Sequence, residues 1–282
     1  MDETLDISLL RTFVASEEGG GCGRAAAALH RSQPTVSQHV RALERRIGHA
    51  LVERDGRAAR FTDVGERLLV EARRIIAVHD EALARLDGAG ARPLVVGVPE
   101  VLAGALVAVL AVAVAEAQPA RPVTFAVDRS GPLLDAVITG TLDLAVVLDL
   151  DRDAPGIEAA ALPLRWWAAP GWRPPQGDAS VPVVTWVEPP GIGQQIIEQL
   201  RAAGLHAETA VESIGFDGAR AAARAGLGAV VLPELADAHA GLEPCDELPS
   251  PGRAAVRVVA RQGLGTAVPD AAIRAVSSAL PR

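Results

Sequence analysis

The segment Arg31-Ser32-Gln33-Pro34-Thr35-Val36-Ser37-Gln38 decides how the amino-terminal part of this 282-residue chain is interpreted. Ser32 can cap the start of a helix, and Pro34 suits the first helical turn because its missing N–H costs nothing there. A single apolar stripe follows, and Gly48 then ends the helix; the stripe consists of Val36, Val40, Leu43 and Ile47. The segment therefore predicts a helix whose first turns are crowded with polar side chains.

The flanking residues complete a compact head. Ile7–Ser16 has apolar residues at helical spacing, and residues 24–30 form an alanine-rich stretch of high helix propensity. Downstream, Arg54-Asp55-Gly56-Arg57 predicts a tight turn between two short strands, Leu51-Val52 and Ala59–Phe61. We therefore expect two helices joined by a turn, with a hairpin behind them.

This pattern suits contact with duplex DNA. A helix in the major groove reads base edges with its first turns, so it needs short hydrogen-bonding side chains there and cations for phosphates. Arg54, Arg57 and Arg60 would contact the flanking backbone or minor groove as a wing. The predicted DNA-binding residues are Arg24, Arg31, Ser32, Gln33, Pro34, Thr35, Ser37, Gln38, His39, Arg41, Arg45, Arg54 and Arg57.

The charge distribution supports DNA contact over a merely solvated polar helix face. Residues 20–61 contain eight arginines and three acidic residues, a balance of +5, although the whole chain carries −8. Residues 91–282 contain 14 arginines and 21 acidic residues, a balance of −7. A basic module attached to an acidic one is typical of a nucleic-acid-binding head on a larger domain.

Length and composition narrow the class of protein. A chain of 282 residues predicts at least two domains, and 49% hydrophobic with 22% charged residues is typical of a globular protein. Cys22 and Cys245 are far apart, which favours a reducing cytoplasm over a disulfide framework or a zinc site.

The chain opens on acidic residues rather than a signal peptide. The apolar run Val101–Ala115 is shorter than the roughly 20 residues that span a bilayer, so we expect a buried helix and no membrane partner.

Residues 62–86 predict one long helix. Its apolar residues follow a 4-3-4-3-4 spacing that indicates a coiled-coil-like contact with a second copy, or else packing on its own domain. The predicted dimerisation residues are Leu68, Ala72, Ile75, His79, Ala82 and Leu86. Residues 87–90 predict a flexible joint.

Beyond the joint, β-rich runs alternate with helical stretches, which predicts largely parallel sheets with helices on both faces and a ligand crevice at the carboxyl ends of strands. The predicted strands are Leu94–Val98, Val123–Val127, Leu142–Val147, Trp166–Ala169, Val181–Trp186, Ala229–Leu232 and Ala255–Val259. The predicted helices are Val101–Ala117, Leu133–Thr139, Gly193–Ala203, Gly218–Ala225 and Asp270–Leu280.

The ordered motifs resemble the LysR-type transcriptional regulators. In the head these are Leu9–Ala15, Arg24-Ala25-Ala26, Leu29-His30, Ser32–Gln38, Arg41–Glu44, Ile47-Gly48, Leu51–Arg54, and Phe61-Thr62 with Gly65-Glu66. The carboxyl-terminal half resembles the family's effector domain more weakly, at Leu94–Val98, Gly140–Val147 and Ala225–Pro233.

The resemblance implies a multidomain fold: a winged helix-turn-helix, a linker helix, and a two-subdomain α/β effector domain like periplasmic binding proteins. The predicted limits are 1–61 for the head, 62–90 for the linker, and 91–282 for the effector domain, with subdomains of about 93–161 plus 262–282 and about 162–261. It also implies a cytoplasmic, nucleoid-associated regulator that binds a promoter inverted repeat as a dimer or tetramer, with RNA polymerase as a candidate partner.

The resemblance places a small-molecule effector between the two subdomains. The predicted effector-binding residues are Pro99, Glu100, Val101, Arg129, Ser130, Thr185, Trp186, Ser213 and Ile214, and the loop of residues 188–193 after Trp186 is a further cleft candidate. Glu100 favours an effector that offers a hydroxyl or an amine, although it could instead only complement a helix dipole. The four tryptophans, Trp166, Trp167, Trp172 and Trp186, could form an aromatic wall or belong to the core.

Two rival classes are an enzyme and a small-molecule-binding protein without a DNA-binding role. The six histidines show no metal-ligand spacing, and the sequence has neither a P-loop nor a G-x-S-x-G elbow. We therefore predict no catalytic residues, no metal and no cofactor. The basic head argues against a carrier that never contacts DNA.

Overall fold

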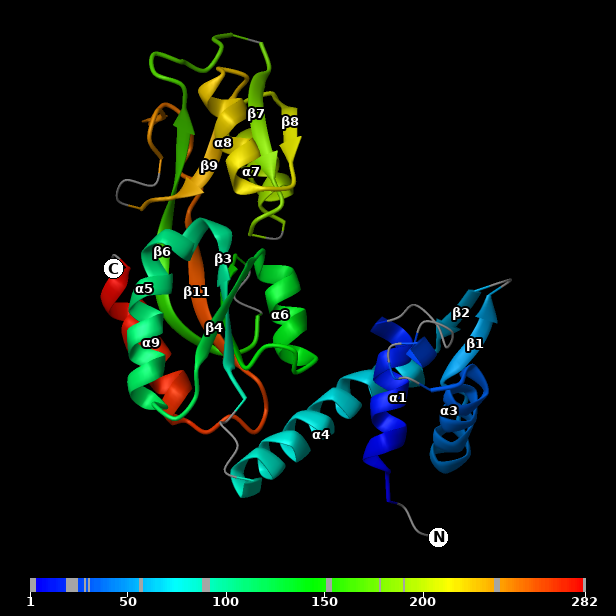
Figure 1. Ribbon diagram of the computed structural model, residues 1–282. Coiled ribbons are helices and arrows are strands. Elements are labelled where there is room, and N and C mark those ends of the chain that lie inside the picture. Colours follow the sequence, from blue (N-terminus) through cyan, green and yellow to red (C-terminus); the bar gives the residue numbers. More distant parts are fainter. Residues whose placement is uncertain are drawn as a thin grey trace. The chain divides into compact units, whose positions relative to one another are not determined.

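The computed structural model describes residues 4–18, 25–27, 29, 31–55, 58–87, 92–150, 154–177, 179–189, 191–235 and 239–280 (Figure 1). The chain divides into two compact units, one of residues 1–92 with 138–141 and the other of residues 93–137 with 142–282.

The first unit is built from helices and one hairpin. Its elements are α1 (Ile7–Glu18), the helical residues 25–27, α3 (Gln33–Ile47), β1 (Val52–Asp55), β2 (Ala58–Phe61) and α4 (Asp63–Asp87). β1 and β2 pair antiparallel, with Val52 opposite Phe61. The core joins α1, α3, the hairpin and the start of α4, and its buried residues are Leu10, Phe13, Val14, Val40, Leu43, Leu51, Leu69 and Ala72.

The start of α4 is fixed to the hairpin by two polar contacts and one glycine. The Thr62 hydroxyl donates to the Ala50 carbonyl at 2.8 Å and accepts from the Gly65 N–H at 3.0 Å. A Cβ atom on Gly65 would lie 2.1 Å from the Leu51 carbonyl oxygen. Only glycine therefore allows the helix to pass so close to this backbone.

The second unit contains one continuous mixed sheet with the strand order β4-β3-β5-β11-β6-β9-β7-β8, and β10 pairs with β6. Its strands are β3 (Leu94–Pro99), β4 (Val123–Asp128), β5 (Leu144–Asp149), β6 (Ile157–Ala168), β7 (Val181–Trp186), β8 (Ala207–Ser213), β9 (Ala229–Pro233), β10 (Glu243–Pro244) and β11 (Arg253–Ala260). Its helices are α5 (Glu100–Ala117), α6 (Ser130–Ile138), α7 (Ile192–Ala202), α8 (Phe216–Arg224) and α9 (Ala267–Ala279).

Two groups of parallel strands are joined by long antiparallel strands. β3 pairs parallel with β4 and β5, and β7 pairs parallel with β8 and β9. β6 pairs with β11 through its first half and with β9 and β10 through its second half. We call the part around β3, β4, β5 and β11 the first subdomain and the part around β7, β8 and β9 the second subdomain.

Three sequence-based expectations differ from this sheet. β11 lies inside the predicted limits of the second subdomain but pairs with β5 of the first from Ala255 to Ala260. β6 starts at Ile157, well before the predicted Trp166, and β8 was not predicted. β8 lies at the sheet edge and its residues are exposed or half-buried, so its sequence Ala-Glu-Thr-Ala-Val-Glu-Ser lacks a clear apolar stripe.

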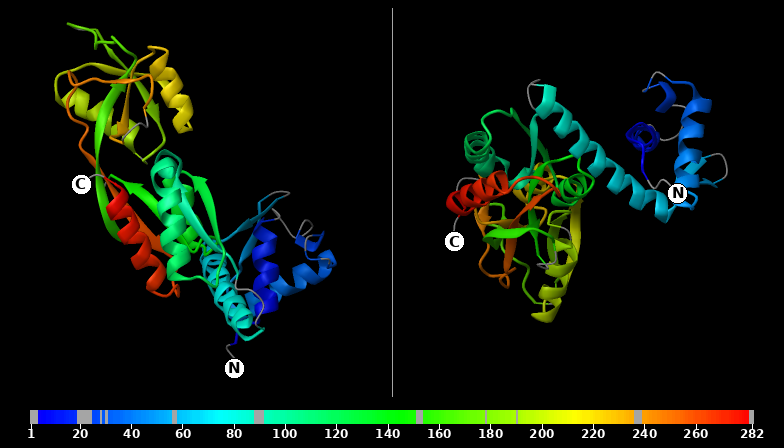
Figure 2. Two further views of the ribbon diagram at one scale, coloured as in Figure 1. Left: turned by 60° about the vertical axis from the view of Figure 1, so that its left-hand side comes forward. Right: turned by 90° about the horizontal axis from the view of Figure 1, so that it is seen from below.

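Side-chain alternation along the strands separates two layers of core. Leu144, Val146 and Leu148 of β5 pack in the cluster that contains α5 and α9. Ala145 and Val147 pack with Leu133 and Val137 of α6. Because successive strand residues point to opposite faces, α5 and α9 cover one face of the first subdomain's sheet and α6 covers the other (Figure 2).

Helix α5 is buried on one face only, which corrects the expectation of a buried helix. Leu102, Leu106 and Leu110 are fully buried, whereas Val112 on the other side is 60% exposed. In the described part of the chain, α5 alone has the length and apolar composition to cross a membrane, but its packing on β3, β4 and α9 makes it a sheet-covering helix.

Asp143, within the Gly140–Val147 motif, has a structural role. It is fully buried, and its carboxylate accepts from Arg261 Nε at 2.6 Å and from the Val95 N–H at 3.0 Å. These bonds tie β3, β5 and the end of β11 together. Asp143 therefore holds the sheet rather than binding a ligand.

Candidate functional site

Helix α3 presents a polar start and a basic side. The Ser32 hydroxyl accepts from the Thr35 N–H at 3.3 Å, and Gly48 adopts φ 79° at the carboxyl end, so both ends are capped as predicted. Val36, Val40 and Leu43 face the core. The only acidic residue of the helix, Glu44, turns to the hairpin and accepts from the Leu51 N–H at 3.0 Å. The remaining surface of α3 therefore carries no negative charge.

Most of the predicted DNA-binding residues on described positions reach the surface. Exposed positions are Arg31, Ser32, Gln33, Pro34, Gln38, Arg41 and Arg45, and half-buried ones are Thr35, Ser37 and His39. Arg24 and Arg57 lie outside the described residues, as does the side chain of Arg54. The turn before α3 is closed by the Arg31 N–H, which donates to the Ala26 carbonyl at 2.9 Å.

His39 has a partner inside the head. Its Nδ1 lies 2.8 Å from the hydroxyl oxygen of Thr12, which itself donates to the Ser8 carbonyl. Thr12 is 1% exposed. The His39 ring is therefore held against α1, an arrangement that favours orienting α3 over reaching a base.

Part of the predicted dimer seam on α4 packs inside the core of the first unit. Ala72 is fully buried in the first unit's core, and Leu68 and Ile75 pack against the same cluster, so Ala72 cannot contact a second copy. The spacing alone could not tell these two kinds of contact apart. Farther along, His79 is half-buried and Ala82 is exposed, while the side chain of Leu86 lies outside the described residues. Val78 and Leu83 are 48% and 45% exposed.

In the second unit, a buried contact joins the two subdomains. Glu188 follows β7 and is 2% exposed, and Ser130, the first residue of α6, is 3% exposed. The Ser130 N–H donates to Glu188 Oε2 at 2.8 Å, and the Ser130 hydroxyl donates to Glu188 Oε1. The same hydroxyl oxygen accepts from the Leu148 N–H at 2.8 Å. One serine thus connects a carboxylate of the second subdomain to β5 of the first.

Burial raises the pKa of Glu188 to about 7. The hydrogen bonds from Ser130 and the charge of Arg129 act in the opposite direction, and the charge of Asp128 adds to the increase. Both proton states of Glu188 are therefore populated near neutral pH.

A second contact joins a carboxylate of the first subdomain to a helix of the second. Glu100, the first residue of α5, accepts through Oε2 from the Phe216 N–H at 3.3 Å. Phe216 begins α8, and the N-cap residue of that helix, Gly215, has no side chain to cap it. The Glu100 carboxylate thus complements the dipole of α8 in the other subdomain as well as that of its own helix.

The other predicted effector-binding residues fall into two groups. Pro99, Val101, Thr185 and Trp186 are buried, and Trp186 donates from Nε1 to the Val231 carbonyl at 3.1 Å. Trp166 is likewise buried, which favours the core over an aromatic wall for both rings. The Ser213 hydroxyl donates to the Gly215 carbonyl at 2.8 Å, Arg129 is half-buried, and Ile214 is 73% exposed.

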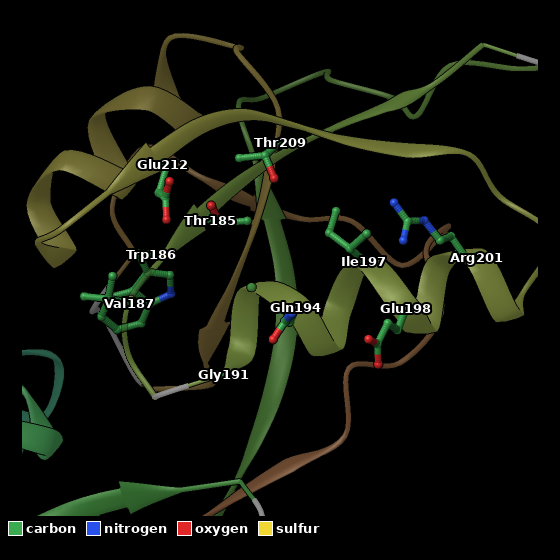
Figure 3. A pocket seen from close by; sticks show the side chains of 11 residues that line it. Thr185, Trp186, Val187, Gly191, Gln194, Ile197, Glu198, Arg201, Thr209 and Glu212 are labelled. Atoms are coloured by element: carbon green, nitrogen blue, oxygen red, sulfur yellow. The ribbon is translucent and has the colours of Figure 1, made fainter.

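A larger cavity of about 690 Å³ lies in the second subdomain (Figure 3). Gln194, Ile197, Glu198 and Arg201 reach it from α7, and Thr209 and Glu212 reach it from β8. Thr185 and Trp186 also line it, so these two predicted residues belong to a different cavity from Ser130, which borders one of about 110 Å³.

The sequence placed the loop of residues 188–193 at the cleft but did not single out Glu188 within it. Its signal was an acidic residue placed directly after a buried strand, at the edge where parallel α/β sheets bind ligands. No group of three metal-ligating side chains occurs among the residues that the structure describes.

Comparison with known proteins gives matches over both units. Residues 7–66 match the profile described as bacterial regulatory helix-turn-helix protein, lysR family, and residues 87–279 match the LysR substrate binding domain. The HTH-type transcriptional regulator PecT of Dickeya dadantii is 30% identical over 228 residues, which covers 80% of this chain and 72% of PecT.

Two solved structures share the fold. LysG from Corynebacterium glutamicum with bound effector Arg is 23% identical with a TM-score of 0.62, covering 99% of this chain and 100% of LysG. Full-length CbnR complexed with target DNA is 19% identical with a TM-score of 0.59, covering 98% and 100%.

Proposed function

This chain belongs to the LysR family of transcriptional regulators, and we propose that α3 reads promoter bases while the junction of the two subdomains receives the effector. As a member of that family it is a DNA-binding regulator with an effector domain, not an enzyme. The single observation that supports the DNA-reading assignment most is the exposed start of α3, with Gln33 and Gln38 beside Arg41 and Arg45. Gln33 would bond a base edge, and the arginines would bind phosphates.

The test is binding of the full chain to its own upstream intergenic fragment and to a scrambled fragment of equal length. Specific binding should exceed non-specific binding by about 10³-fold or more at physiological salt, and both should weaken as salt rises. Equal affinity for the two fragments would overturn the assignment.

For the effector, we propose a small molecule that offers an amine or a hydroxyl. Glu100 and Glu188 both lie at the subdomain junction, and Arg129 there lies 3.9 Å from the Asp128 carboxylate. A junction with two carboxylates favours hydrogen-bond donors and cations over anions. Calorimetric titration with amine-bearing, hydroxyl-bearing and purely anionic metabolites would test this, and binding of the anionic class alone would contradict it.

We further propose assembly through two apolar surfaces. The free end of α4, with Val78 and Leu83, would pair two heads for an inverted repeat, and the exposed face of α5 would pair effector domains into a tetramer. Between Val101 and Ala115, α5 carries no charged residue, as expected for a face covered by another copy. The protein would act on the nucleoid in the cytoplasm, and RNA polymerase would be the partner that responds to its position on the promoter.

A further inference from the structure

At the junction, each subdomain binds one carboxylate of the other at the start of a helix. Glu188 of the second subdomain binds the start of α6 in the first, and Glu100 of the first binds the start of α8 in the second. The start of a helix offers free N–H groups and a positive dipole end, so it binds anions. Each subdomain thus supplies a carboxylate to the start of a helix in the other.

The contact at Ser130 is the more complete of the two. Both of its donors are used by one carboxylate, and both residues are almost wholly buried. Glu100, in contrast, is exposed and makes a single longer bond of 3.3 Å. The junction is therefore held mainly at Ser130.

We propose that Glu188 is an internal ligand: its carboxylate fills a carboxylate-binding site at Ser130 and keeps the two subdomains closed until the amine or hydroxyl of an effector binds Glu188 in place of Ser130. This inference deepens the proposed function, since it rests on the junction being the effector site. A closed ligand-free state lowers the apparent affinity for any effector that needs the open form.

The surroundings of Glu188 suit a contact that can open. Arg129 and Asp128 precede Ser130, Glu100 is the acid at the other junction contact, and Asp149 shares the 110 Å³ cavity with Ser130. The charge of Arg129 lowers the pKa of Glu188, but Arg129 Nε lies 3.9 Å from the Asp128 carboxylate, and no ion pair of Glu188 occurs among the residues that the structure describes. A buried carboxylate without an ion-pair partner is costly to keep ionised, so ionisation of Glu188 weakens the closed state.

The test uses hydrogen exchange of the full chain, without DNA or effector. The Ser130 N–H donates to Glu188, and the Leu148 N–H donates to the Ser130 hydroxyl that this contact holds in place. In Glu188→Ala we expect exchange in peptides covering 128–134 and 145–150 to accelerate at least tenfold. Glu208→Ala, at an exposed position of β8, is the matched control and should change nothing there.

Chemical rescue identifies the site as one for carboxylates. Glu188→Ala removes a CH₂–COO⁻ group, which acetate replaces. Millimolar acetate should restore protection in Glu188→Ala, whereas acetamide should not.

Peptides of α5 should stay protected throughout, which excludes general unfolding. Unchanged exchange in Glu188→Ala, or faster exchange that acetate leaves unaltered, would overturn the internal-ligand proposal. DNA binding plays no part in the readout, so failure here and failure of the proposed function are separate results.

Discussion

Glu188 and Ser130 are 58 residues apart in the chain, yet the Ser130 N–H lies 2.8 Å from the Glu188 carboxylate in a buried contact. The contact joins the two subdomains through one carboxyl group whose pKa is raised by burial to about 7.

The first prediction concerns pH. Glu188 has an ordinary pKa of 4.5 when free and about 7 when buried, so the closed form binds the extra proton between these values. The closed form therefore loses stability as pH rises from about 4.5 to about 7 and changes little above that. The loss from this group is at most about 3.4 kcal/mol, for a pKa difference of about 2.5 at 1.36 kcal/mol for each pKa unit.

Urea unfolding followed by tryptophan fluorescence measures this effect, because all four tryptophans lie in the second unit. Glu188→Gln cannot ionise and should lack this part of the pH dependence. If the variant and the unaltered protein show the same slope between pH 5 and 7, Glu188 does not titrate in this way.

The second prediction concerns base reading. Gln33→Ala should weaken binding to the specific fragment by about 1–3 kcal/mol, because a good base contact contributes that much discrimination, and should leave scrambled DNA nearly unaffected. Fluorescence anisotropy on both fragments measures it. Gln262→Ala, an exposed glutamine of the other unit, is the control. Equal losses on both fragments would rule out a base contact.

The third prediction concerns the phosphate contacts. Arg45→Ala should weaken both fragments alike and reduce the slope of log affinity against log salt by about one, because one phosphate contact is lost. An unchanged salt slope would show that Arg45 does not contact the backbone.

The fourth prediction concerns the joint between hairpin and linker helix. Gly65→Ala would place a methyl group against the Leu51 carbonyl and should destabilise the head by about 1–3 kcal/mol. Gly104→Ala, where nothing lies within 4 Å, should instead stabilise its helix by up to about 1 kcal/mol. Thermal unfolding followed by circular dichroism compares them, and a neutral Gly65→Ala would mean that α4 can shift.

The fifth prediction concerns assembly. Val112→Glu places a charge on the exposed face of α5 and should weaken association of effector domains at least tenfold, since it removes apolar burial and buries a charge. Light scattering across a concentration series measures the mass. Ile157→Glu is matched, because Ile157 is similarly exposed on β6. If both variants keep the assembly of the unaltered protein, the α5 face is not the interface.

Much of the fold follows from short-range sequence patterns. Ser32 and Gly48 cap α3 as predicted, and β7 spans Val181–Trp186 as predicted. Caps, turns and apolar periods involve residues within a few positions of one another, so the sequence by itself determined these elements and the basic polar tip of α3.

Tertiary structure alone decided which side chains meet. It placed Ala72 in the head's core, His39 on Thr12, and β11 beside β5, and it brought Glu188 to Ser130. These contacts join residues that are distant in the chain, and they depend on strand order and helix crossing. Residue spacing does not encode those features, because any apolar or polar partner of suitable size satisfies the same local pattern.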